Sequence, residues 1–450
     1  MSTLLVRNAR VLVTMDETRR EIARGGMFIR GGFIEQVGDT KNLPQIADEI
    51  FDLSGHIVLP GFVNTHHHLN QTLDRAYPSS QNGNLVQWLK MLYPRWEKFK
   101  PEDTAVATEL GLVEIALSGC TTVADHQYLW PKGVTAGGQF EIASKIGVRF
   151  HLGRGSQNVG QAQGGFAPAS LVEDDDDILA STAEIVTKFH NPSPGSFNQV
   201  FVAPSSLRTA TTGLLQKSAE FAAKRNLRFH FHLGETKPEI DFVRDKYGKR
   251  PAQLADELGC LTPRSWVAHG VHFDDDDISA LLRCGCGICH CPSSNMRLSS
   301  GIAPVRRYLN RGLAVGLGVD GSASNDASNL MQEVRAAFLL QRSRYGVLKV
   351  SHKDALRWAT TGSAACVGRT DIGEIAVGKM ADLALFKLDE LRFSGSGDPL
   401  AALVLCGAHR ADRVMVGGRW VVENGQIPGL DAAGLIRRHS AAARTLQAGN

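Results

Sequence analysis

Three consecutive histidines follow an apolar stretch near the start of this sequence. The stretch HIVLPGFVNT runs into His66, His67 and His68. In an extended segment alternate side chains share a direction, so His66 and His68 converge while His67 faces away. Two converging imidazoles could bind a divalent metal ion.

Three further side chains that could bind a metal ion lie at or near the ends of later apolar stretches. LRFHFHLGE carries His232 near its end, SWVAHGV carries His269, and AVGLGVDG reaches Asp320. Imidazole and carboxylate ligands together suit Zn²⁺ or Fe²⁺. An isolated histidine is more often a buried core residue, but five ligand-type groups at matching positions of four stretches predict a metal site.

A second carboxylate lies close to one of these candidate ligands. Glu235 comes three residues after His232 in the segment HLGET. A metal-activated hydroxide needs a partner that carries its proton to a leaving group, and a carboxylate can do this. A loop glutamate is otherwise a solvated surface residue, but within this constellation we expect Glu235 to be catalytic.

These groups need a scaffold that brings the ends of distant strands together. From about residue 51, eight short apolar stretches alternate with helical patterns such as DTAVATELGLVEIALSG. This alternation predicts parallel βαβ units, and eight units predict a closed (β/α)8 barrel. Such barrels carry their active sites at the C-terminal ends of the strands, where the candidate groups stand.

The two ends of the chain have a different pattern. The first 50 residues and those after about 371 read as short strands with Gly-rich turns. We therefore expect an α/β fold in three segments. Residues 1–57 form the first part of a small β-sandwich, residues 58–370 the metal-dependent barrel, and residues 371–450 the rest of the sandwich and a tail. The helix-like tail, DAAGLIRRHSAAARTLQ, has no role that its sequence reveals.

The composition is that of an ordinary globular protein. Hydrophobic residues make up 43% of the chain, charged residues 21%, and the formal net charge is +3. These values argue against disorder and give no reason to expect a nucleic-acid or membrane partner. No stretch approaches the roughly 20 apolar residues of a membrane span, and no signal-peptide pattern stands at the N-terminus. With eight cysteines, as is usual in a reducing compartment, we expect a soluble cytoplasmic protein.

Two other motifs have simpler explanations. GLGVDG (residues 316–321) matches GxGxxG, but it ends a strand on Asp320 where a dinucleotide fingerprint would open a helix. The cysteines of CGCGICHC lack the distant second pair that a zinc knuckle needs. We expect them to be small apolar residues of a buried strand.

Six motifs, in order along nearly the whole chain, resemble the amidohydrolase superfamily, and within it the deaminases of the guanine and chlorohydrolase-like branch. They are LPGFVNTHHH, FHLGET, VAHGVHF, HCPSSNMRLSSG, GLGVDGSASND and GEIAVGKMADLALF. The resemblance implies a distorted (β/α)8 barrel with a β-sandwich built from both termini. It also implies one divalent metal ion, for which we expect zinc with iron as the alternative. Homo-oligomers are common in the family.

The resemblance also assigns roles to the candidate residues. The implied metal ligands are His66, His68, His232 and Asp320. Glu235 shuttles protons, His269 polarises the hydroxide or the developing tetrahedral centre, and Asp320 also accepts the proton of the attacking water. No lysine replaces a ligand as a carbamylated bridge would require, which favours a single metal ion.

Local stretches resemble deaminases of 8-oxoguanine and of isoxanthopterin, a pterin. These stretches are NTHHH with QTLDRA, LKMLYPRW, SGCTTVADH, RGS and CPSSNMRLSSG. Both substrates carry an exocyclic amine on a carbon between two ring nitrogens, and attack on that carbon releases ammonia. Gln71 can offer such an edge a donor and an acceptor. Further candidate substrate contacts are Trp88, His126, Arg154 and Arg208, although Trp88 could be a core residue and the arginines could pair with loop carboxylates.

Two stretches depart from the pattern of 8-oxoguanine deaminases. RAY (residues 75–77) stands where RAW is usual, and APSSLRT (residues 203–209) where a CSPFSVT-like stretch is usual. The second change places Arg208 beside the expected pocket, where a guanidinium suits a larger, more oxidised or carboxylated ring. We therefore expect a zinc-dependent aminohydrolase of isoxanthopterin or a related pterin. The alternatives are 8-oxoguanine, then guanine or a triazine, and, from another class, a non-catalytic scaffold.

Overall fold

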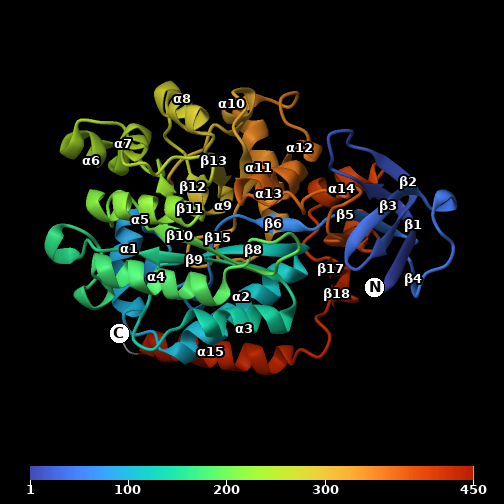
Figure 1. Cartoon of the computed structure of the whole chain (residues 1–450), viewed down its shortest axis with the longest axis horizontal. Coiled ribbons are helices and arrows are strands. Elements are labelled where there is room, and N and C mark those ends of the chain that lie inside the picture. Colours follow the sequence, from blue (N-terminus) through green and yellow to red (C-terminus); the bar gives the residue numbers. More distant parts are fainter. Residues whose placement is uncertain (449–450) are drawn as a thin grey trace.

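Eight parallel strands form the centre of the molecule (Figure 1). The structure is a computed structural model that describes residues 1–448. Neighbouring strands pair in the order β6, β8, β9, β10, β11, β12, β13, β14. Their bounds are β6 (Phe62–Asn64), β8 (Cys120–Gln127), β9 (Arg149–Ser156), β10 (Asn198–Pro204), β11 (Arg228–Leu233), β12 (Ser265–His269), β13 (Gly287–His290) and β14 (Val315–Leu317). The predicted barrel is confirmed.

The barrel is nearly closed between its first and last strands. Just after β6, the backbone amide and the hydroxyl of Thr65 both donate to the carbonyl of Leu317 in β14, at 3.0 and 2.9 Å. Two very short strands, β7 (His67–His68) and β15 (Asp320–Gly321), then pair with each other, with Asp320 opposite His67. The seam of the barrel therefore lies where the candidate ligands stand.

Helices in the connections between strands cover the outside of the barrel (Figure 1). They are α2 (Pro101–Leu117), α3 (Ala136–Ile146), α4 (Asp175–Phe189), α5 (Thr212–Lys224), α6 (Lys237–Tyr247), α7 (Pro251–Glu257), α8 (Asp275–Cys284), α9 (Pro292–Arg297), α10 (Val305–Asn310), α11 (Leu330–Tyr345), α12 (His352–Arg357) and α13 (Ser363–Cys366). Asp174 and Asp274 cap α4 and α8 by accepting from amides of the first turn. Among residues 1–448, no helix combines the length and the apolar character that crossing a membrane requires.

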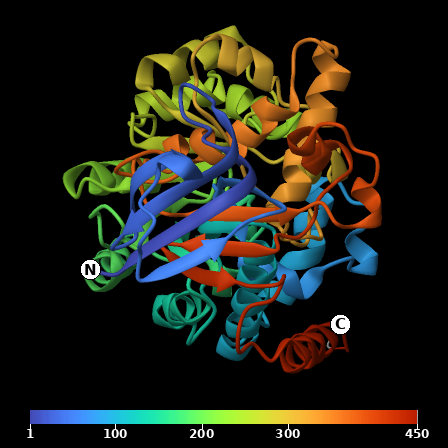
Figure 2. The ribbon, with the colours of Figure 1, turned by 90° about the vertical axis from the view of Figure 1, so that its right-hand side faces the viewer.

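Both ends of the chain contribute to a second sheet beside the barrel (Figure 2). Its strands pair in the order β18, β17, β16, β5, β1, β2, β3, and β4 pairs with β1. Their bounds are β1 (Thr3–Val13), β2 (Glu21–Arg30), β3 (Phe33–Asp39), β4 (Glu49–Asp52), β5 (His56–Pro60), β16 (Leu383–Lys387), β17 (Arg413–Val416) and β18 (Arg419–Val422). We call this the terminal sheet. The first half of β1 pairs with β4 and its second half with β5.

The chain crosses from the terminal sheet to the barrel at Gly61. The run HIVLPGFV, expected to be one barrel strand, is divided between β5 of the terminal sheet and β6 of the barrel. The expected boundary after residue 57 therefore lies inside β5. A Cβ at Gly61 would come within 2.3 Å of Thr121 Cγ2, so glycine permits a close approach that any side chain would prevent.

The C-terminal tail forms helix α15 (Ala432–Ala448), which packs against α2 and the short helix η2 (Leu69–Asp74). His439 Nε2 lies 3.2 Å from Thr72 Oγ1 of η2. Arg95, in α1 (Leu85–Trp96), donates to the carbonyl of Leu446 at 2.9 Å. The tail therefore braces the segment that follows the three histidines.

A buried ion pair joins the barrel to the terminal sheet. Arg149, at the start of β9, and Asp382, just before β16, are both buried. Arg149 Nε and Nη2 donate to the two carboxylate oxygens of Asp382 at 2.8 and 2.9 Å. Arg149 Nη1 donates to the carbonyls of Gly195 and Ser196. Each charge is thus hydrogen-bonded in a position that water does not reach.

We expect Arg149→Met to destabilise the protein strongly, because it leaves the Asp382 carboxylate buried without its cation. The expected loss is about 3–5 kcal/mol of unfolding free energy, measured from the midpoint of urea unfolding. The control Lys188→Met removes the exposed ion pair with Glu184 and should cost less than about 1 kcal/mol. Equal midpoints for the two variants would contradict a structural role for the buried pair.

Candidate metal and active site

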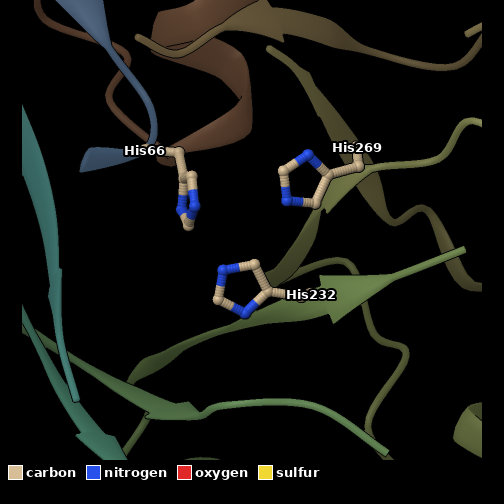
Figure 3. A group of neighbouring side chains, drawn as sticks. All are labelled: His66, His232 and His269. Atoms are coloured by element: carbon tan, nitrogen blue, oxygen red, sulfur yellow. The ribbon is translucent and has the colours of Figure 1, made fainter. Parts of the chain in front are cut away.

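Five predicted ligand-type side chains converge at the C-terminal end of the barrel. His66 and His68 follow β6, His232 lies in β11, His269 ends β12, and Asp320 begins β15. Figure 3 shows the rings of His66, His232 and His269 extending from three separate segments into one common space. Asp320 Oδ1 lies 3.4 Å from the Nε2 atoms of both His66 and His68. His67 faces another way, with its Nε2 3.0 Å from Ser328 Oγ.

The protons of two of these imidazoles are held on the nitrogen that faces away from the cluster. His68 Nδ1 donates to the carbonyl of His126 at 2.8 Å, and His232 Nδ1 donates to the carbonyl of Ser205 at 2.7 Å. In a neutral imidazole the other nitrogen then carries a lone pair. The two Nε2 atoms face each other across 3.2 Å, a separation that suits two lone pairs directed at one cation.

A chain of hydrogen bonds fixes a third lone pair on His66. His230 Nδ1 donates to the carbonyl of Trp266 at 2.7 Å, so His230 Nε2 accepts from His66 Nδ1 at 2.8 Å. His66 Nε2 is therefore unprotonated. It is buried and has no hydrogen-bond partner among residues 1–448, as expected of an atom that ligates a metal.

The donor set fits zinc. Zinc binds imidazole nitrogen at about 2.0–2.1 Å in tetrahedral geometry, which places two ligand nitrogens about 3.3 Å apart. The Nε2 atoms of His68 and His232 are 3.2 Å apart. Burial lowers the pKa of His66 and of His232, and it lowers the pKa of His68 to about 4. All three are therefore neutral at physiological pH, as metal ligands must be.

Asp320 is ionised in the same environment. Burial raises the pKa of its carboxyl group, but the imidazoles that surround it, His66 first and then His269 and His68, hold that pKa well below its usual value. Ser294 Oγ donates to Asp320 Oδ2 at 2.6 Å. Oδ1 accepts from the amide of Gly321 at 2.7 Å, and its other lone pair can bind a cation on the side that faces the imidazoles.

His269 differs from the other three imidazoles. The amide nitrogen of Asn295 lies 3.1 Å from His269 Nδ1, and donation in this orientation leaves the ring proton on Nε2. Burial lowers the pKa of His269 to about 3, so the ring is neutral. It offers an N–H to the cavity rather than a lone pair to a metal.

Glu235 is buried beside His269. Its Oε2 lies 3.6 Å from His269 Nε2, and its Oε1 accepts from Ser300 Oγ at 3.4 Å. Burial, together with the charge of Asp320, raises the pKa of Glu235 well above its usual value. A carboxyl group in this environment can hold a proton near neutral pH and deliver it to a leaving group.

Two of the converging residues have an unfavourable backbone conformation. His269 has φ 77° and Asp320 has φ 63°, in the left-handed region that costs a residue with a side chain of order 1–3 kcal/mol. The amide of Asp320 donates to the carbonyl of His66 at 3.1 Å. The surrounding structure thus holds both side chains in directions that relaxed strand ends would not give them.

A cavity opens above these residues, and three of the predicted substrate contacts line it: Gln71, Trp88 and Arg208. Gln71 Nε2 donates to the Tyr128 hydroxyl at 3.1 Å, whereas Gln71 Oε1 is buried and has no partner in the described chain. Trp88 Nε1 donates to the carbonyl of Ala323 at 2.9 Å, so its ring serves as an apolar wall. Gln71 is therefore the side chain here with a free acceptor.

Arg208 provides a positive charge on the cavity wall. Its guanidinium carbon lies 4.8 Å from the ring centre of Phe166 and 5.2 Å from that of Phe242. No carboxylate of residues 1–448 forms an ion pair with it within 4.0 Å. Two aromatic faces thus hold a guanidinium whose hydrogen-bond donors remain available to a ligand.

The other two predicted contacts, His126 and Arg154, do not line the cavity. His126 Nε2 lies 2.9 Å from the carbonyl of Ala203, and its ring stacks behind His232 at 4.9 Å. Arg154 is buried and donates to both carboxylate oxygens of Glu173, at 2.9 and 2.5 Å. Arg154 therefore pairs with a loop carboxylate, which was the alternative interpretation of this residue, and not with a ligand of the cavity, which was the expected one.

Two residues near the reacting end of the cavity were not predicted from the sequence. Tyr128 lines the cavity and accepts from Gln71. Its position two residues after His126, at the end of β8, is the signal that could have identified it, since alternate strand residues share a direction. Ser294 anchors Asp320 and lies within the motif HCPSSNMRLSSG.

Comparisons with known proteins agree with this geometry. A model of the Amidohydrolase family matches residues 57–421. The 8-oxoguanine deaminase of Pseudomonas aeruginosa is 48% identical over the full length of both chains. An isoxanthopterin deaminase from an unknown prokaryotic organism is 34% identical over 95% of this chain and 94% of that protein.

A solved structure resembles the whole molecule. The crystal structure of atrazine chlorohydrolase TrzN from Arthrobacter aurescens TC1 complexed with zinc matches with a TM-score of 0.93 and 30% identity, over 98% of this chain and 100% of that one. The family match covers most of the sequence, including every candidate metal ligand. The chain therefore belongs to the amidohydrolase family.

Proposed function

We propose that the protein is a metal-dependent deaminase that hydrolyses the amino group of 8-oxoguanine. The observation that carries this proposal is Glu235, a buried carboxyl group with a raised pKa that lies 3.6 Å from His269 Nε2 beside the metal cluster. Loss of ammonia requires a group that can protonate the leaving amine, and this carboxyl group can. The 48% identity with an 8-oxoguanine deaminase supports the substrate.

The metal ligands in this proposal are His66, His68, His232 and Asp320, and the metal is zinc. When bound, zinc supplies Lewis acidity that lowers the pKa of water to about 7. The three unprotonated Nε2 atoms and the ionised carboxylate support this ligand set. His269 stays outside it because its Nε2 carries the ring proton.

The remaining residues bind the ring and move protons. Gln71 Oε1 accepts from a ring N–H, and Arg208 binds an oxo group of the ring. Asp320 accepts a proton from the attacking water as the new C–O bond forms, and the His269 N–H stabilises the negative charge that develops. Glu235 delivers a proton to the amino nitrogen as the C–N bond breaks. Water and 8-oxoguanine are consumed, and ammonia and urate are formed.

Isoxanthopterin is the second candidate substrate. The sequence favours it because of Arg208, and the guanidinium does lie on the cavity wall. The relatives support the alternative better, at 48% identity for the 8-oxoguanine deaminase against 34% for the isoxanthopterin deaminase. An arginine that binds oxo groups suits both rings, so we replace the pterin by 8-oxoguanine as the proposed substrate.

The substrate proposal is tested by ammonia release from 8-oxoguanine, isoxanthopterin and guanine, each with the same zinc-loaded enzyme. We expect kcat/KM to be highest for 8-oxoguanine, because the 8-oxoguanine deaminase is the more similar of the two relatives, at 48% against 34% identity. Turnover of isoxanthopterin alone would return the assignment to the pterin. Release of ammonia from none of the three would refute the proposed function.

Removal of the metal should abolish activity without unfolding the barrel. Dialysis against a chelator is expected to give an inactive protein with unchanged far-UV circular dichroism, and one equivalent of zinc per chain should restore activity. His68→Ala should reduce the metal content, whereas the control His67→Ala, on the opposite side of the segment, should retain it. Full activity of metal-free protein would exclude the mechanism.

Glu235→Gln should separate metal binding from turnover. The amide cannot transfer a proton, so kcat should fall by about 10²–10⁴-fold, while the zinc content stays at one per chain. Glu220→Gln, at an exposed position of α5, is the matched control and should behave like the wild type. An active Glu235→Gln variant would remove this residue from the mechanism.

A further inference from the structure

Glu239, in the first turn of α6, is a buried carboxylate in the wall of the same cavity. Its Oε1 accepts from the amide of Gly234 and its Oε2 from the amide of Glu235, each at 2.9 Å. Burying a carboxylate is costly unless its oxygens are hydrogen-bonded. Here two successive peptide groups satisfy one oxygen each.

These peptide groups form the turn that leads from His232 to Glu235. Gly234 has φ 67°, and consecutive amides in such a turn form a concave site for an anion. On its other side, the Gly234 carbonyl accepts from the amide of His272 at 2.9 Å. A Cβ at Gly234 would lie 2.3 Å from the ring of Phe273. The turn is thus clamped between Glu239 and the segment after β12.

The side chain of Glu235 itself has few restraints. Its polar contacts within the described chain are Ser300 Oγ at 3.4 Å and His269 Nε2 at 3.6 Å, both longer than a strong hydrogen bond. The direction of its carboxyl group therefore depends on the backbone that carries it. That backbone is held at its own amide by Glu239.

We propose that Glu239 is a positioning residue that aims the Glu235 carboxyl group at the amine of the bound ring. It accepts from both amides of the turn and so fixes the direction of the Glu235 Cα–Cβ bond. The two carboxylates have separate tasks: Glu235 moves the proton, and Glu239 keeps Glu235 in place. This inference rests on the proposed function, because it gives Glu239 a task only if Glu235 transfers protons.

The first test is Glu239→Gln in the zinc-loaded enzyme with 8-oxoguanine. Glutamine has one acceptor oxygen, so one of the two amides loses its partner and the turn can shift. A misplacement of about 1 Å can cost up to 10²-fold in rate, so we expect kcat to fall by about 10- to 100-fold. KM and the zinc content should stay at the wild-type values. The control Asp241→Asn, at a partly exposed site of the same helix paired with Arg244, should change none of kcat, KM and zinc content.

A double-mutant cycle separates positioning from general support of the fold. If Glu239 acts through Glu235, adding Glu239→Gln to Glu235→Gln should lower the residual rate by less than about twofold, because residues in one unit are not additive. An equal fold-loss in both backgrounds would overturn the inference, as would a wild-type kcat for Glu239→Gln. Where Glu239→Gln does not fold, the same cycle with Glu239→Asp, which keeps both oxygens on a shorter side chain, gives the same decision.

The inference and the proposed function fail in different ways. Wild-type enzyme that releases no ammonia from any of the three heterocycles overturns the function, and the role of Glu239 falls with it. Wild-type enzyme that is active, and loses activity with Glu235→Gln but not with Glu239→Gln, overturns the inference alone.

Discussion

The site depends on the direction of three imidazole lone pairs. Backbone carbonyls of His126 and Ser205 hold the protons of His68 and His232, and the carbonyl of Trp266 does so for His66 through His230. These carbonyls lie at or next to the ends of the barrel strands, whose peptide groups are fixed by the sheet. The barrel therefore selects the tautomers as well as the positions of the ligands, and hydrogen bonds of this kind are what orient histidine ligands in metal sites.

The seam of the barrel supplies the carboxylate. Because β6 and β14 meet through Thr65 and Leu317, the short strands β7 and β15 pair directly and bring Asp320 against His66 and His68. The positive φ of Asp320 shows that this approach is strained. The hydrogen bonds of the seam, among them that from the Asp320 amide to the carbonyl of His66, hold the backbone in this conformation.

Much of this arrangement follows from local sequence patterns. The ends of buried strands can be recognised from apolar runs, and a parallel barrel gathers those ends at one face. The sequence alone therefore predicts that His66, His232 and Asp320 lie close together. The partners of Arg154 and Arg208 could not be predicted in this way. Arg154 lies in β9 and Arg208 follows β10, but Arg154 pairs with Glu173 from the next loop and Arg208 packs against two aromatic rings. The partner of such a side chain depends on the path of the neighbouring loops, and the hydrophobic pattern of the sequence does not predict that path.

The fold has two features that the sequence did not predict for the same reason: the crossing between sheets at Gly61 and the position of the C-terminal helix α15. The Pro60-Gly61 pair inside HIVLPGFV marks a break, but nothing in the run shows that its two parts belong to different sheets. At the crossing point, Thr121, about sixty positions away, leaves no space for a Cβ on residue 61. The sequence of α15 is amphipathic, but the surface that it covers is assembled only when α2 and η2 are in place. Contacts between distant segments decide both features.

The electrostatics of the cavity separate groups that would otherwise behave alike. Asp320 and Glu235 are both buried carboxyl groups, but neighbouring imidazoles keep Asp320 ionised whereas Glu235, beside the charge of Asp320, favours its protonated form. One can therefore accept a proton from water while the other donates one to a leaving amine. Two carboxyl groups whose pKa values are pushed in opposite directions are what a hydrolysis that both removes and delivers a proton requires. Asp320, a proposed metal ligand, and Glu235, the proposed proton donor, thus lie in one buried site, where the charge of Asp320 contributes to the raised pKa of Glu235.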